Sequence, residues 1–227
     1  MAAKTSSASD PRERLLHAAF EEIEARGLAR VTVRGVAAAA GVNIAAVSYY
    51  FRSKELLVQA ALESTLQAMV ADVEAMLARF SADAEAVLVE ILTYYFEGML
   101  RYPRLSKAHM HAAFLDDDYD GQFPNELGSV LSQLAAAIRK AVPSLDARTA
   151  SQRVVTAYSS VCLPAVLPGL YSSLDALSTP GDRVAYVRAL ARTALAPAGG
   201  ERVTPRRARA TLGREPLSAS RLRRKRR

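Results

Sequence analysis

The chain of 227 residues contains no tryptophan, one cysteine, eleven glycines and ten prolines. The single cysteine, Cys162, excludes a disulfide framework within the chain and is typical of the reducing cytoplasm, where we expect the protein to work. The few glycines and prolines fall mainly between periodic segments, which argues against a turn-rich β-sandwich. Hydrophobic residues make up 50% of the chain and aromatic residues only 7%, so we expect helices packed through Ala, Leu and Val side chains.

Long apolar segments of the targeting or membrane type are also lacking. The N-terminal MAAKTSSASDPRER has no apolar run of the kind found in signal peptides. Residues 154–171 carry no charge, but Pro164, Pro168 and Gly169 interrupt them. These breakers favour a buried, kinked helix over a membrane span, so we expect no membrane partner.

Positive charge is concentrated at the C-terminus. Eleven basic and two acidic residues between 200 and 227 give that segment a formal charge of +9. Because the whole chain carries +7, residues 1–199 carry −2. Residues 198–227 lack apolar periodicity and are predicted to form a basic, disordered tail. This tail either adds non-specific phosphate contacts or is a solvated extension, and the sequence leaves both readings open.

Helical periodicity accounts for the rest of the chain, and no strand alternation is found. The sequence therefore predicts an all-α protein, with a three-helix domain over 10–56 and a larger helical domain over 57–197. Asp10 and Gly27 bound the first helix as N-cap and C-terminal glycine, and Glu13 is placed to complete a capping box. The later helices are expected at 33–40, 44–51, 54–80, 84–102, 103–116, 125–142, 146–170 (kinked) and 180–196.

The two short helices at 33–40 and 44–51 have the form of a helix-turn-helix, spanning about 32–51. They are joined by a three-residue turn in which Gly41 suits a left-handed backbone and Asn43 caps the second helix. Such a unit places the second helix in the major groove of DNA. The side chains expected to pack the two helices together are Val36, Ala37, Val42, Val47 and Phe51.

The second of these helices has no charged residue. An ordinary solvated helix face usually carries Lys or Glu, so this one is expected to face a partner. Its small and hydrogen-bonding side chains suit base edges, thymine methyl groups and phosphates. The alternative is a helix buried in a domain interface. The residues predicted to contact DNA from this helix and its cap are Asn43, Ile44, Ala45, Ala46, Ser48, Tyr49 and Tyr50.

Lys54 begins the long helix that follows Ser53. A cation is disfavoured at this positive end of the helix dipole. The placement is favourable if the helix end and the lysine ammonium together bind an anion, such as a DNA phosphate. Thr32 and Arg34 are placed to hold a phosphate in the same way at the preceding short helix. The alternative for Lys54 is an ordinary solvated lysine.

Residues 32–57, TVRGVAAAAGVNIAAVSYYFRSKELL, resemble the DNA-binding domain of TetR-family transcriptional regulators. Order, spacing and flanking helices agree over about residues 10–57. One departure is Ser48, where many members have Tyr, so a phosphate contact at Ser48 itself is in doubt.

The resemblance implies a homodimeric, ligand-responsive repressor that binds a palindromic double-stranded DNA operator and is not an enzyme. It also implies that a small-molecule effector binds the C-terminal domain and releases the DNA. The dimer interface would come from the last two helices, 146–170 and 180–196. On the latter, one face holds Val184, Val187, Ala191 and Leu195.

An aromatic and methionine cluster on three of the later helices is a candidate wall for the effector pocket. The alternative is that these side chains are ordinary core. A pocket so lined would take a mostly apolar ligand. The candidate residues are Tyr94, Tyr95, Met99, Met110, Phe114 and Tyr158.

The sequence gives little support for a metal site, a redox site or a catalytic site. His109 and His111 are two apart on a helix and point in different directions, and the acidic run at 116–120 lacks the glutamate of a calcium loop. Cys162 has no basic neighbour in the sequence and is expected to be packing rather than a redox sensor. No nucleophile, phosphate-loop or dinucleotide motif is present, so we expect no cofactor, metal or catalytic residue.

Overall fold

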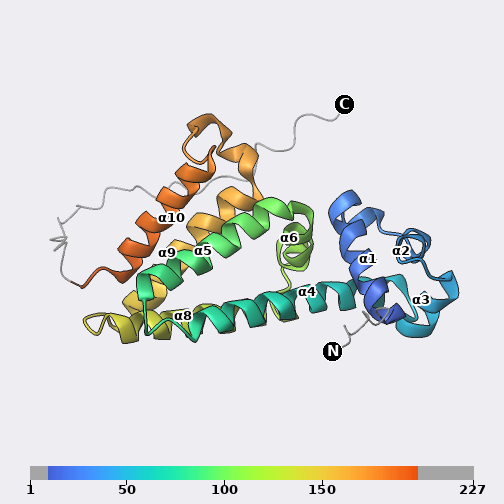
Figure 1. Cartoon of the computed structure of the whole chain (residues 1–227), viewed down its shortest axis with the longest axis horizontal. Coiled ribbons are helices and arrows are strands. Elements are labelled where there is room, and N and C mark those ends of the chain that lie inside the picture. Colours follow the sequence, from blue (N-terminus) through green and yellow to red (C-terminus); the bar gives the residue numbers. More distant parts are fainter. Residues whose placement is uncertain (1–9, 199–227) are drawn as a thin grey trace, which may run out of the picture.

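The computed structural model describes residues 10–198, and within this range the protein consists of ten α-helices and three short 3-10 helices, with no strand. The all-α prediction is confirmed. The N-terminal helices gather at one end of an elongated molecule, and the later helices form a layered bundle at the other end (Figure 1).

The N-terminal domain is built from α1 (Pro11–Arg26), η1 (Leu28–Arg30), α2 (Val33–Ala39) and α3 (Ile44–Phe51). Its helices begin where the sequence places capping side chains, each of which accepts a backbone N–H from the first turn. The predicted capping box at Glu13 is not formed, and Asp10 alone caps α1. The caps of α1, α2, α3 and α4 are Asp10, Thr32, Asn43 and Ser53.

Helix α4 (Lys54–Leu77) connects the two halves of the protein. Its first turns pack on α1 and α3, and its later turns lie beside α5 and α8 (Figure 1). The buried side chains follow the same division: Leu57 and Ala61 belong to the N-terminal core, whereas Val73 belongs to the C-terminal core.

The C-terminal bundle consists mainly of α5 (Ala84–Arg101), α8 (Gln122–Ala141), α9 (Ala147–Val166) and α10 (Pro180–Leu195). Helices α5 and α9 pack closely, with α8 and α10 against them. The largest fully buried side chains of its core are Phe96, Leu88, Ile91, Leu92, Ile138 and Val73.

Several helix boundaries differ from the predicted ones. The helix predicted over 103–116 is divided at Met110 into α6 (Pro103–His109) and α7 (His111–Leu115). Helix α8 starts at Gln122 rather than 125, because Pro124 is tolerated in its first turn. Helix α9 accommodates Pro164 but ends at Val166, and η2 (Pro168–Leu170) and η3 (Ser172–Leu174) follow it.

Helix α6 contributes to both halves of the protein. Its Leu105 and Ala108 side chains complete the core formed by α1, α2, α3 and the start of α4. The N-terminal core therefore includes side chains from beyond the boundary predicted at residue 57.

Residues 10–198 include no helix that is both long enough and apolar enough to cross a membrane. They also hold no group of three potential metal-ligating side chains. The predicted basic tail falls on residues 199–227, which lie outside the described part of the chain.

Candidate DNA-binding surface and effector cavity

The turn between α2 and α3 has the geometry that the sequence predicts. Gly41 adopts φ +63°, in the left-handed region that a side chain disfavours. The Val42 amide donates to the carbonyl oxygen of Ala37, and the Asn43 side chain accepts from the Ala45 amide at 2.9 Å. Val36, Ala37, Val47 and Phe51 are buried between the helices, while Val42 is half-buried. This small core fixes α3 relative to α2.

Helix α3 presents its uncharged face to the outside. Val47 and Phe51 point inward, while Tyr49 is 81% exposed and Ile44 is 47% exposed. Within residues 10–198 no element covers this face, so burial in an interface inside the chain is not the reason for its lack of charge.

A shallow hollow on this surface brings together several of the predicted DNA contacts. Asn43, Ala45, Ala46, Tyr49 and Tyr50 line it. Arg14 of α1 lines the same hollow and was not among the predicted residues. Two arginines in the exposed first turn of α1, where the helix dipole disfavours cations, are the sequence signal that could have drawn attention to it.

The other predicted contacts do not line this hollow. Thr32 and Arg34 are exposed at the start of α2, and Ser48 is exposed on α3. The Thr32 hydroxyl accepts the Gly35 amide at 3.1 Å, which leaves its own hydrogen available for a phosphate oxygen. Lys54 is half-buried at the start of α4 and lines a separate groove between α4 and α7.

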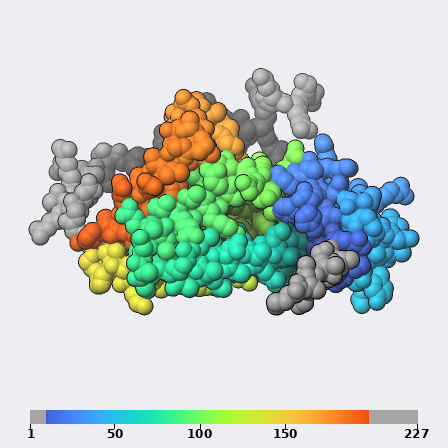
Figure 2. All heavy atoms as spheres, in the orientation of Figure 1, coloured from blue at the N-terminus to red at the C-terminus, as the bar shows by residue number. Residues whose placement is uncertain are grey.

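A cavity of about 490 Å³ lies between the two halves of the protein. It is bounded by α4, α5 and α6, with single side chains from α1, α8 and α9. The space-filling view shows a hollow in the surface where α1, α4 and α5 meet (Figure 2). Its predicted wall residues Tyr94, Tyr95, Met99, Met110 and Tyr158 all line it.

Phe114 does not line this cavity, contrary to the expectation from sequence. Its side chain is 71% exposed on α7. The reason is the division at Met110, which turns α7 away from the helical phase that a continuous 103–116 helix would have.

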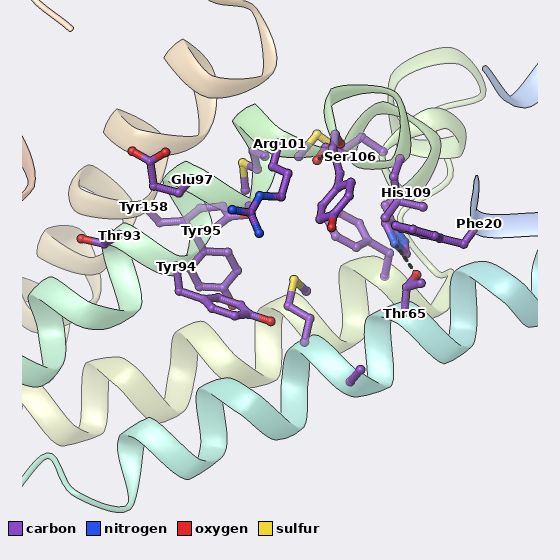
Figure 3. Close-up of a pocket in the computed structure, with 18 residues that line it drawn as sticks. Phe20, Thr65, Thr93, Tyr94, Tyr95, Glu97, Arg101, Ser106, His109 and Tyr158 are labelled. Carbon is purple, nitrogen blue, oxygen red and sulfur yellow. Dashed lines mark hydrogen bonds between the residues drawn. The ribbon is translucent and has the colours of Figure 1, made fainter. Parts of the chain in front are cut away.

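His109 is the most unusual polar residue in the cavity wall. Its Nε2 lies 3.1 Å from the hydroxyl oxygen of Thr65, which itself donates to the Leu62 carbonyl oxygen (Figure 3). The Thr65 hydrogen is thus used, and Nε2 of His109 is the donor. The ring stacks on Phe123, and burial lowers the pKa of His109 to about 4. The imidazole is therefore neutral at neutral pH.

Residues 15–61 match the family model described as "Bacterial regulatory proteins, tetR family". The match covers the N-terminal domain, which is therefore of the TetR type. A comparison with curated protein sequences gives no match.

Solved structures of transcriptional regulators share the fold over most of the chain. A TetR transcription regulator from Haloarcula marismortui superposes with a TM-score of 0.62 at 21% identity, over 82% of this chain and 97% of that one. The regulator FadR from Bacillus subtilis, in complex with stearoyl-CoA, gives a TM-score of 0.55 at 17% identity, over 81% and 97%. A putative TetR-family regulator from Mesorhizobium loti gives 0.59 at 16%, over 85% and 96%.

The predicted face of α10 is turned inward. Val187 and Ala191 are fully buried in the core of their own chain, and Leu195 is half-buried. Only Val184 of that set is exposed, so this face is not free to form a dimer contact. A different set of apolar side chains is exposed on and after α9: Val155, Leu163, Leu167, Leu170 and Leu174.

Cys162 packs against the C-terminal core and is half-buried. Burial raises the pKa of its thiol, and Tyr158 contacts it. The thiolate is thus disfavoured, in keeping with a packing role for this cysteine.

Proposed function

We propose that this protein is a cytoplasmic repressor that binds a palindromic operator as a homodimer and is released from it by a small, mostly apolar effector. The observation that carries the proposal is the exposed, uncharged surface of α3, held rigidly by the small core behind it. An exposed helix of this kind is suited to a major groove about 12 Å wide.

In the proposed complex, α3 reads base edges while the flanking helix starts hold the DNA backbone. Ala45 and Ala46 allow close approach, and Asn43 retains its amide hydrogens for a base or a phosphate. Lys54 and the start of α4 would hold a phosphate, as would Thr32 with Arg34 at α2. Arg14 would add a further phosphate contact beside Tyr49.

A homodimer is supported by exposed apolar side chains on α9, on α10 and in the segment that joins them. Leu163, Leu167, Leu170, Leu174 and Val184 are each at least 37% exposed. Several exposed leucines within a short stretch of chain favour an association surface. A two-fold dimer would present two copies of α3 to half-sites about one DNA turn (about 34 Å) apart, or a multiple of it.

An effector role is supported by the cavity. Its volume lies within the usual range for small-molecule sites, and its wall is mainly aromatic and methionine side chains. The structural relative FadR from Bacillus subtilis was solved with stearoyl-CoA. This supports an effector with a large apolar part for the present protein as well.

Selection of DNA sequences from a random pool by the full-length protein tests the proposal. We expect a palindromic consensus, and we expect Ala45→Leu to change that consensus because the larger side chain meets the base edges. Ala136→Leu, at an exposed alanine of α8, is the matched control and should leave it unchanged. If the protein binds no selected sequence more tightly than bulk competitor DNA, the proposed function is wrong.

A further inference from the structure

The charges on the cavity wall indicate what kind of effector it takes. Two residues with ionised side chains line the cavity, Glu97 and Arg101, both on α5. They are one helical turn apart, yet no ion pair joins them among the described residues. The net charge that the cavity presents to a ligand therefore depends on whether each of the two side chains has another partner of opposite charge.

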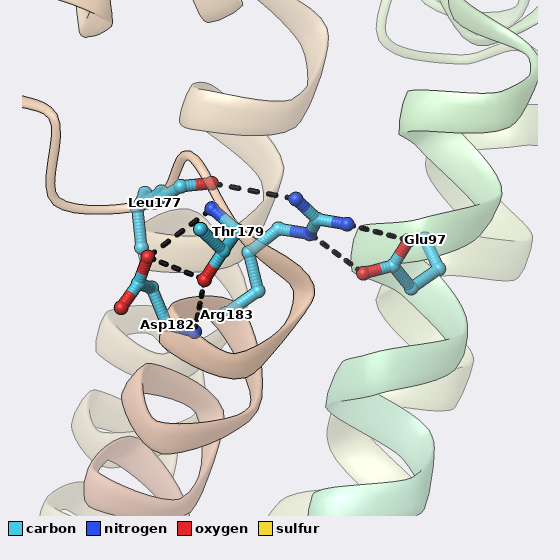
Figure 4. Close-up of polar contacts among 5 residues, drawn as sticks. All are labelled: Glu97, Leu177, Thr179, Asp182 and Arg183. Atoms are coloured by element: carbon cyan, nitrogen blue, oxygen red, sulfur yellow. Dashed lines mark hydrogen bonds and ion pairs between the residues drawn. The ribbon is translucent and has the colours of Figure 1, made fainter.

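Glu97 is already neutralised by Arg183 of α10. The Nε of Arg183 lies 2.7 Å from one carboxylate oxygen of Glu97, and an Nη lies 3.4 Å from the other (Figure 4). Arg183 is held from a third side by the carbonyl oxygen of Leu177, and its side chain is only 16% exposed. A two-point pair of this kind satisfies the carboxylate and leaves it little attraction for a ligand cation.

Arg101 has no comparable partner within residues 10–198. Its side chain extends over the cavity toward the wall that holds Tyr94 and Tyr95 (Figure 3). His109 adds no charge, since its buried imidazole is neutral. Thus the one uncompensated charge on the described wall is positive.

A second, independent feature is the hydroxyl of Tyr95. Tyr95 is 4% exposed, and its hydroxyl oxygen has no hydrogen-bond partner among the described residues. Its neighbours Tyr94 and Tyr158 contact it ring to ring, and the Tyr94 hydroxyl donates instead to Asp72 at 2.8 Å. An unpartnered buried hydroxyl costs stability unless a ligand supplies an acceptor.

We propose that the effector is an apolar organic acid, whose carboxylate pairs with Arg101 and which accepts a hydrogen bond from Tyr95. This inference rests on the proposed function, in which the cavity is the effector site. The methionine and aromatic side chains hold the apolar body of the acid, while the pairing of Glu97 with Arg183 removes the repulsion that Glu97 would otherwise exert on it.

Calorimetric titration of the full chain with decanoate, decanol and decylamine tests the chemistry of the head group at constant chain length. We expect decanoate to bind about tenfold more tightly than decanol, in line with a charge-assisted hydrogen bond, and decylamine to bind most weakly. In Arg101→Gln the affinity for decanoate should fall to that for decanol. Arg139→Gln, at an exposed arginine of α8, is the control and should leave all three affinities unchanged.

Tyr95→Phe provides a second readout that does not depend on Arg101. Removing the unpartnered hydroxyl should raise the melting temperature of the free protein while weakening decanoate binding severalfold. Equal affinities for the three compounds, unaffected by Arg101→Gln, would overturn the organic-acid inference and leave the cavity as an effector site. If none of the three compounds binds, the effector site itself is rejected together with the inference.

Discussion

Glu24 and Arg104 join the end of α1 to the beginning of α6 in both directions. The Glu24 carboxylate accepts the backbone amides of Arg104 at 3.1 Å and Leu105 at 2.9 Å. In return, the Arg104 guanidinium donates to the carbonyl oxygens of Glu24, at 2.9 Å, and Ala25. Helix α6 has no capping side chain of its own, so Glu24 supplies the cap from 80 residues away.

Replacing Glu24 by alanine should therefore destabilise the protein. The change leaves two amides of α6 without their acceptor, and we expect a loss of about 1–2 kcal/mol in the free energy of unfolding. Glu24→Gln keeps an acceptor oxygen and should lose less. Urea denaturation measures the free energy of unfolding of both variants. Glu21→Ala is the control, because Glu21 is exposed on the same helix and its contact with His17 is long, at 3.9 Å. Equal effects of the two alanine changes would contradict the capping role.

Lys54→Ala should weaken DNA binding to every sequence by a similar factor. If the ammonium of Lys54 neutralises one phosphate, the slope of log affinity against log salt should become shallower by about 0.9. Fluorescence anisotropy across a salt series measures this slope. Lys140→Ala, at the far end of α8, should leave it unchanged. Lys54→Glu with wild-type affinity would refute the proposed docking.

Stability should fall as the pH drops from about 6.5 to about 4, through His109. Burial lowers the pKa of its folded-state imidazole from 6.5 to about 4, so the unfolded chain binds the extra proton in this window. The stabilisation is complete above pH 6.5 and lost as the pH approaches 4. Its upper limit is about 3 kcal/mol by the usual conversion of pKa shifts. His109→Gln should show a smaller drop than the wild type over that window, which separates this effect from that of the carboxyl groups.

Gly35→Ala and Gly128→Ala should have opposite effects, although both glycines lie within helices. A Cβ at Gly35 would come within 2.9 Å of the buried Glu22 carboxylate and 3.0 Å of the Thr32 hydroxyl that caps α2. Gly128 on α8 has nothing within 4 Å of its added Cβ, so alanine there should stabilise the protein by about 0.5–1 kcal/mol. We expect Gly35→Ala to be destabilising by thermal denaturation. A gain equal to that of Gly128→Ala would show that Glu22 and Thr32 move aside at little cost.

The parts of the structure that the sequence predicts well depend on local interactions. Asp10, Thr32, Asn43 and Ser53 act as caps because each bonds an amide two or three residues away. The turn at Gly41 is likewise decided by its immediate neighbours.

The parts that sequence reasoning missed depend on contacts between distant segments. In the sequence, Glu24 resembles any surface glutamate, because its partners on α6 are 80 and 81 residues away. Arg14 lies beside α3 only because the tertiary fold brings α1 and α3 together. Phe114 was grouped with the cavity because a helix over 103–116 carries it there, whereas the interruption at Met110 changes its direction.

Phe20 belongs to α1, yet it also lines the cavity and packs edge-on against Tyr102 at 5.2 Å between ring centroids. A chimera that joins this DNA-binding half to the C-terminal half of another regulator would therefore carry one foreign side chain into the transplanted cavity. Its effector preference should differ from that of the donor until position 20 is exchanged as well. Recombination between such regulators would thus be constrained at position 20, although this residue does not belong to the proposed DNA-binding surface.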